Sequence, residues 1–133
     1  MNKRILAVGS EKVDSVRPKR KPRIRISGFW LNEYGFERDS LVIAEYDQER
    51  ITFKLQGSGM EAYKAVVKQV RESDSLALLQ VKAEMHNGKR TPHIEVKGPW
   101  LEDLGFSIGS WFVLRPEYGV FTLRLLDLDR LGY

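Results

Sequence analysis

The sequence contains no cysteine and only two histidines among its 133 residues. Without cysteine the chain has no disulfide bonds, no thiolate metal ligands and no cysteine nucleophile. It also lacks any apolar run approaching the roughly 20 residues that a membrane-spanning helix needs. The apolar run after the first residues, MNKR, is only ILAV, which is too short for the apolar region of a secretory signal peptide, so a signal peptide is not expected. These absences predict a cytoplasmic protein that makes no contact with a membrane.

Acidic residues are missing from one short segment, and basic residues fill it. The chain carries a net charge of +4, and residues 17–25, RPKRKPRIR, include no acid. Two interpretations of this segment stay open. It is a solvated, poorly ordered arm, or it binds a polyanion such as DNA or RNA.

A tandem repeat dominates the rest of the sequence. When the chain is shifted by 70 residues, residues 22–55 align with residues 92–125 without a gap, and GFWLNEYGF falls on GPWLEDLGF. Matching of a residue as rare as tryptophan without a gap indicates a duplication. The identical pairs are Pro22/Pro92, Ile24/Ile94, Gly28/Gly98, Trp30/Trp100, Leu31/Leu101, Gly35/Gly105, Phe36/Phe106, Ser40/Ser110, Thr52/Thr122 and Leu55/Leu125, with Lys19/Lys89 and Arg20/Arg90 just upstream.

Each copy begins with an alternating strand and a very short helix. Residues 23–27 and 93–97 alternate apolar and polar side chains, which predicts strands with one buried face. In the helix that follows, Gly28 or Gly98 takes the N-cap position and Pro99 the first helical position. Gly35 or Gly105 then ends the helix with a Schellman cap, which brings Leu31 against Phe36 and Leu101 against Phe106.

A hairpin completes each copy. In copy 1 we expect strands 41–45 and 51–55 around a turn at 47–49. In copy 2 we expect strands 111–114 and 121–125 around a turn at 116–119. One further strand is expected before each copy, at 4–8 and at 76–81.

The segment 59–72 between the copies has the pattern of an amphipathic helix. Its apolar stripe consists of Met60, Tyr63, Val66, Val67 and Val70. We expect this stripe to pack on the body of the protein. Binding of a partner protein through residues 59–72 is the alternative.

About 45 residues with a few strands bury too little apolar surface to fold alone. Two copies in one chain can share a core as the subunits of a homodimer do. We therefore expect a mostly β fold with short helices, in which two halves form one pseudo-twofold β-barrel within a monomeric chain. The expected divisions are a first repeat at 1–56, a helical linker at 57–74, a second repeat at 75–126 and a tail at 127–133.

The repeated pattern, basic-Pro-x-Ile-x-Ile/Val-x-Gly-x-Trp-Leu-x-x-x-Gly-Phe followed by a hairpin, resembles the SymE toxin family of bacterial type I toxin–antitoxin systems. The resemblance covers residues 22–55 and 92–125. It implies the swapped-hairpin fold of AbrB and MazE, in which two halves interleave their hairpins. Two copies in one chain depart from the family pattern. So does Asp39, which stands where copy 2 has Gly109.

The resemblance and the charge together predict binding of DNA or RNA. Cations of the strands and loops beside the short helix would contact successive phosphates, with a strong salt dependence. Copy 1 should dominate, because Arg23 and Arg25 become His93 and Glu95 in copy 2. The expected contact residues are Arg17, Lys19, Arg20, Lys21, Arg23, Arg25, Lys82, Lys89, Arg90 and Lys97.

Cleavage of RNA is an alternative that the family resemblance implies. It requires a general base, a general acid and a cation, and the sequence shows no such constellation. Its two histidines, His86 and His93, are not repeated, and Glu33 and Asp103 are interpreted as solvated helix acids. Catalytic residues stay unassigned, and no cofactor or metal site is expected.

Two further alternatives stay open. Trp30 and Trp100 either pack where the two copies meet or stack on bases. The chain itself is alternatively an antitoxin-like or regulatory module, in which residues 59–72 or the tail contact a protein.

Overall fold

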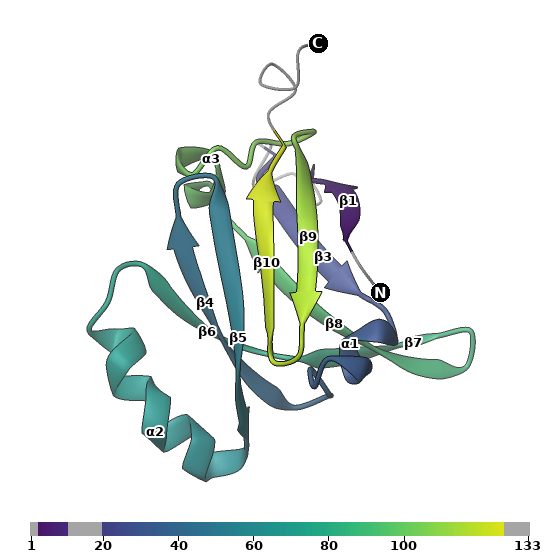
Figure 1. Ribbon diagram of the computed structural model, residues 1–133, viewed down its shortest axis with the longest axis vertical. Helices are drawn as coiled ribbons and strands as arrows, with labels where there is room; N and C mark the ends of the chain where they lie inside the picture. The colour runs from purple at the N-terminus through teal and green to yellow at the C-terminus, as the bar shows by residue number, and fades with distance from the viewer. Residues whose placement is uncertain (1–2, 11–19, 127–133) are drawn as a thin grey trace.

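The computed structural model describes residues 3–10 and 20–126, which form two antiparallel sheets and three helices (Figure 1). The larger sheet has the order β1 (Arg4–Ala7), β9 (Trp111–Glu117), β10 (Val120–Leu125), β5 (Arg50–Ser58), β4 (Ser40–Asp47), β6 (Leu76–Gln80). The smaller sheet has the order β2 (Gly9–Ser10), β3 (Pro22–Ser27), β8 (Lys89–Lys97), β7 (Lys82–His86). The helices are α1 (Trp30–Glu33), α2 (Gly59–Arg71) and α3 (Trp100–Asp103). The expected mostly β class is confirmed.

The two sheets share one hydrophobic core. In Figure 1, β3 and β8 pass behind β9 and β10. Ile24 and Ile94 of the smaller sheet belong to the same cluster of buried side chains as Phe53 and Phe121 of the larger sheet. Both copies therefore contribute to a single core, as expected from the small size of each.

Two strand pairings join the copies, and each is centred on equivalent residues. Thr52 of β5 lies opposite Thr122 of β10. Arg25 of β3 lies opposite Glu95 of β8. Because both pairings are antiparallel, residues on either side of these centres also pair in equivalent combinations. Each copy thus contributes strands to both sheets. In each sheet, one strand of copy 1 pairs directly with one strand of copy 2.

Hydrogen bonds outside the strands repeat the same relationship. Gly28 N–H donates to the carbonyl of Pro92 at 3.1 Å, and Gly98 N–H donates to the carbonyl of Pro22 at 3.1 Å. The hairpin turns reach the other copy in the same way, since Gly119 N–H donates to the Tyr34 carbonyl at 2.8 Å. Such paired contacts hold each short helix against the other copy.

The two glycines of each repeat, such as Gly28 and Gly35 in copy 1, lie at the start and the end of the short helix. At its end, Phe36 N–H donates to the Leu31 carbonyl at 2.9 Å while Gly35 has a φ of +91°, which is the predicted Schellman cap. At its start, Gly28 has a φ of +138°, and a Cβ there would lie 2.6 Å from Cδ1 of Trp30. The indole occupies this space because its N–H donates to the Ser27 carbonyl at 3.1 Å. Glycine is therefore required before this tryptophan.

The start of the short helix differs by one residue from the prediction. The N-cap positions are Phe29 and Pro99, both with helical dihedral angles, rather than Gly28 and Gly98. Gly28 still accepts the first hydrogen bond, from Leu31 N–H at 3.2 Å. The difference arises because the positive φ of the glycine places the first helical dihedrals on the residue after it.

Both repeated tryptophans pack against the other copy. The ring of Trp30 meets Phe121 edge-on, with centroids 6.2 Å apart. Trp100 contacts Tyr46, with centroids 4.3 Å apart. The packing interpretation is confirmed, and the 8% exposure of Trp30 leaves little ring surface for a base.

The larger differences lie in the second copy and in α2. Strand β9 extends to Glu117, so Pro116 lies within the strand and the turn is formed by Tyr118 and Gly119 alone. Strands β2 and β7 were not predicted. In α2, Val66 is buried on the larger sheet, but Met60 is 63% exposed, so the predicted stripe packs only in part. The expected tail at 127–133 lies outside the described residues.

Candidate nucleic-acid interface

The alternation of β3 sorts its side chains between the core and the outer surface. Ile24 and Ile26 are 1% and 2% exposed and face the larger sheet. Arg23 and Arg25 therefore project from the opposite face, because successive side chains of a strand point to opposite sides. This outer face of the smaller sheet receives the first predicted contact residues.

Strand pairing adds the second copy's cations to the same face. Lys97 of β8 lies opposite Arg23, and Lys82 of β7 lies opposite His93 of β8. Paired residues share a face of the sheet. The outer face of β3, β8 and β7 thus gathers four of the predicted residues, Arg23, Arg25, Lys82 and Lys97, and we call these four the basic face.

Two carboxylates lie among these cations. Glu84 of β7 forms an ion pair with Arg25, and Glu95 lies 3.8 Å from Nζ of Lys97. Both pairs are partly exposed, where an ion pair is worth about 0–1 kcal/mol and exchanges readily with another anion. In the described part of the chain, Arg23 and Lys82 form no ion pair. The face keeps an excess of positive charge.

The other predicted contact residues surround the face or fall outside it. Arg20 is exposed and donates a hydrogen bond to Oγ of Ser10 at 3.3 Å. Lys89 and Arg90 are exposed in the β7–β8 hairpin, which projects from the body of the protein (Figure 1). Lys21 is half-buried beside the start of β3. Arg17 and Lys19 lie outside the described residues.

His93 occupies the middle of the basic face. Its Nδ1 is buried and has no hydrogen-bond partner among the described residues. Burial lowers the pKa of His93 below its usual 6.5, and the charges of Arg25 and Lys82 act in the same direction, against Glu84 and Glu95. The ring is therefore neutral at neutral pH and becomes a cation only in acid or beside an added anion.

A groove of about 340 Å³ runs beside His93. Its apolar wall consists of Leu78 and Leu79 of β6, and its other lining residues, besides His93, are Gln80, Lys82, Glu95 and Lys97. Two ammonium groups and one neutral imidazole at one groove suit an anionic group such as a phosphate. Glu33 and Asp103 lie exposed on α1 and α3 and take no part in this site.

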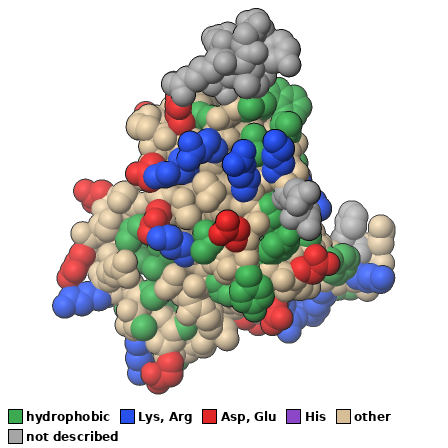
Figure 2. Space-filling model, in the orientation of Figure 1, with side chains coloured by type: hydrophobic (Ala, Val, Ile, Leu, Met, Phe, Trp, Pro, Cys, Tyr) green, Lys and Arg blue, Asp and Glu red, His purple; other side chains and the backbone are tan. Residues whose placement is uncertain are grey.

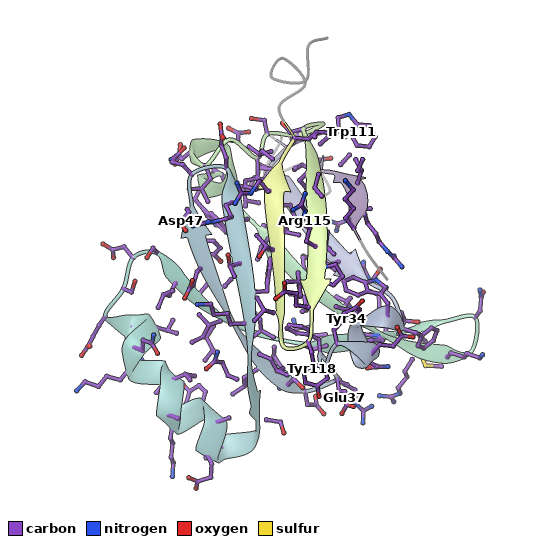
Figure 3. The ribbon with its side chains drawn as sticks, in the orientation of Figure 1. Tyr34, Glu37, Asp47, Trp111, Arg115 and Tyr118 are labelled. Carbon is purple, nitrogen blue, oxygen red and sulfur yellow. The ribbon has the colours of Figure 1, made fainter. Side chains whose placement is uncertain are left out.

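A second group of cations, which was not predicted from the sequence, lies on the larger sheet. Arg124 of β10 lies directly opposite Arg50 of β5, and Arg115 of β9 lies opposite Thr122 on the same face. Figure 2 shows Lys and Arg side chains in a row across the upper part of this face, and Figure 3 places Arg115 on β9 within it. The sequence does contain an indication of this group. Strands β5 and β10 alternate buried apolar residues with polar ones, so their polar side chains are expected on the outer face of the sheet.

Other kinds of site find no support in residues 3–10 and 20–126. There, no three acidic or histidine side chains gather to hold a metal ion. None of the helices there has the length and hydropathy of a membrane span.

Comparisons of the chain with protein-family models, with curated proteins and with solved structures find no match.

Proposed function

We propose that this protein binds nucleic acid through the basic face of its smaller sheet. The observation that carries the proposal is the convergence of cations from both copies, Arg23 and Arg25 from one and Lys82 and Lys97 from the other, on one outward surface. The resemblance to the SymE family supports the same conclusion.

The spacing of these cations suits a phosphate backbone. Arg23 and Arg25 are two residues apart on one strand, which corresponds to about 6.8 Å. This is about twice the 3.4 Å axial rise per nucleotide of one DNA strand. Lys97 lies on the neighbouring strand, opposite Arg23. The face can thus follow several phosphates at once, while the weak ion pairs of Arg25 and Lys97 open to admit them.

The proposal includes the finer fold. We propose that the two copies form a swapped-hairpin, pseudo-twofold barrel, in which one chain does the work of an AbrB-like dimer. The pairing of Thr52 with Thr122 and of Arg25 with Glu95 supports this. Light scattering should then find a monomer of 15.4 kDa. An obligate dimer with strands exchanged between chains would contradict it.

A salt series of binding curves tests the function. Duplex DNA, single-stranded DNA and RNA, each labelled with fluorescein, are titrated with protein between about 50 and 200 mM salt. The triple variant Arg23→Gln, Lys82→Gln, Lys97→Gln should bind more weakly. Its slope of log K against log salt should fall by about 2–3, because each lost phosphate contact contributes about 0.7–0.9.

The chain offers a control of equal charge. Lys64, Lys68 and Arg71 are exposed on α2, so changing these three to Gln removes the same charge from another element. The proposed function fails if both triple variants lose the same affinity, or if neither changes the salt slope. A denaturing gel of the RNA probe, run in parallel, reports cleavage separately.

A further inference from the structure

The outer face of the larger sheet is covered differently in the two copies. In copy 1, helix α2 packs on β4, β5 and β6. Leu41 and Ile43 of β4 are only 9% and 4% exposed, although they lie outside the main core cluster, and Val66 of α2 is 7% exposed. These side chains form a small second layer between the helix and the sheet.

Copy 2 presents the same surface without a helix in the described residues. Trp111 and Val113 of β9 are the equivalents of Leu41 and Ile43, seventy residues on. Ile5 of β1 is the equivalent of Leu78, since Ile5 pairs with Val113 as Leu78 pairs with Ile43. Trp111 is 48% exposed and Ile5 is 55% exposed. Figure 3 shows Trp111 at the upper end of β9.

The charges beside this surface also differ between the copies. In copy 1, Nζ of Lys54 lies 2.9 Å from the carboxylate of Glu45. The equivalents in copy 2 are Arg124 and Arg115, so two cations stand where copy 1 has an ion pair. Within the part of the chain that the structure describes, neither arginine forms an ion pair. Both line a hollow of about 480 Å³ together with Val113, Val120, Thr122 and Glu117, so the two arginines exceed the single carboxylate there.

We infer that the face formed by Ile5, Trp111, Val113, Arg115 and Arg124 is the docking site of a partner protein's amphipathic helix with an acidic flank. The chain itself shows the kind of element that fits, because α2 covers the equivalent face of copy 1. The apolar side of the partner helix covers Trp111 and Ile5, as the side of α2 that carries Val66 covers Leu41 and Ile43. Its carboxylate binds between Arg115 and Arg124, in place of the acid that Glu45 supplies in copy 1.

A helical peptide derived from α2 tests the site on the full chain. The acidic probe carries residues 59–71 with Lys64→Glu and Lys68→Glu, and the basic probe keeps both lysines. Each probe is cross-linked to hold its helix, since a free peptide of this length is only marginally helical. Fluorescence anisotropy of the labelled peptides should show that the acidic probe binds more tightly.

Two variants locate the binding on this face. Trp111→Ser should weaken binding of the acidic probe at least about tenfold. The partner helix would bury Trp111, and a tryptophan buried in an interface is a typical hot spot. Met85→Ser removes an apolar side chain that is 63% exposed on the smaller sheet, and it should leave binding unchanged. Circular dichroism melting confirms that both variants are folded.

A charge exchange tests the acidic flank. Arg115→Glu recreates the copy 1 arrangement beside Arg124, and it should remove or reverse the preference for the acidic probe. The inference is overturned if neither probe binds at concentrations up to about 1 mM, or if Trp111→Ser leaves binding unchanged. It is also overturned if the probes fail and Arg115→Glu instead weakens nucleic-acid binding, since the face would then contact a polyanion.

Discussion

Thr52 and Thr122 lie directly opposite each other in neighbouring strands, although 70 residues separate them in the chain. They occupy the same position in the two copies of the repeat. A second equivalent pair, Arg25 and Glu95, has the same relationship in the other sheet. The copies are thus joined through both sheets, and the core between the sheets belongs to both.

The first prediction concerns the glycine before the repeated tryptophan. Gly28→Ala should lower the free energy of unfolding by about 1–3 kcal/mol more than Gly109→Ala, because its Cβ would overlap the buried indole of Trp30. Gly109 also has a positive φ, of +88°, but it has open space around it. Both substitutions therefore introduce backbone strain, and only Gly28→Ala adds steric overlap with the Trp30 indole. Urea unfolding measures the two values, and equal losses would contradict this account of the motif.

The second prediction concerns the shared core. Phe121 of copy 2 stacks on Phe53 of copy 1, with centroids 4.5 Å apart, and also meets Phe36 at 4.9 Å. Phe121→Ala should destabilise the protein by about 3–5 kcal/mol. Because its neighbours belong to copy 1, amides of both copies should lose protection from hydrogen exchange together.

A surface variant provides the control for this experiment. Met85→Ala, at a side chain that is 63% exposed, should change stability by less than about 0.5 kcal/mol. Loss of protection in copy 2 alone after Phe121→Ala would show that the copies fold independently.

The third prediction concerns His93 and pH. Burial lowers the pKa of His93 in the folded chain below 6.5, with Arg25 adding to this effect. The unfolded chain therefore binds a proton more readily, so folding stability falls as the pH drops from about 6.5 through the lower, folded pKa. His93→Gln should remove this part of the pH dependence. Urea midpoints between about pH 5 and pH 8 measure it, and identical profiles for the two proteins would refute it.

The fourth prediction concerns Tyr46, which packs against Trp100. Burial raises the pKa of Tyr46 to about 12. The hydroxyl of the unfolded chain ionises near 10, so this contribution to stability is complete below pH 10 and is lost as the pH rises through about 12. Ultraviolet titration of the wild type should contain a late phenol transition that is absent from Tyr46→Phe. Trp100→Ala should expose Tyr46 and lower its pKa, and an unchanged titration would argue against burial by Trp100.

Much of the local structure was predictable from the sequence. The Gly35 cap with its Leu31 contact, the alternating strand at Ile24 and Ile26, and the two hairpins depend on neighbours within a few residues. The hairpin of β7 and β8 was missed, although Asn87-Gly88 between alternating segments is a strong hairpin signal. Because β7 was not predicted, the pairing that places Lys82 opposite His93 was not predicted either.

The basic face was predictable only as a set of residues. The sequence identified Arg23, Arg25, Lys82 and Lys97, but their gathering on one sheet depends on the pairing of β3 with β8 and of β8 with β7. The cations of the larger sheet were missed because Arg50 and Arg124 are far apart in the chain and meet only through strand pairing.

The sequence by itself determined the repeat, the alternation of strands such as β3 and the C-terminal cap of each short helix, because these depend on local sterics and local hydrogen bonds. Only the tertiary structure decided which strands pair across 70 residues, and therefore which charges share a face. It alone also shows that α2 covers Leu41 and Ile43 while Trp111 and Ile5 are exposed. Two copies of one pattern have the same local preferences, so the difference between their surfaces arises from what packs on each of them.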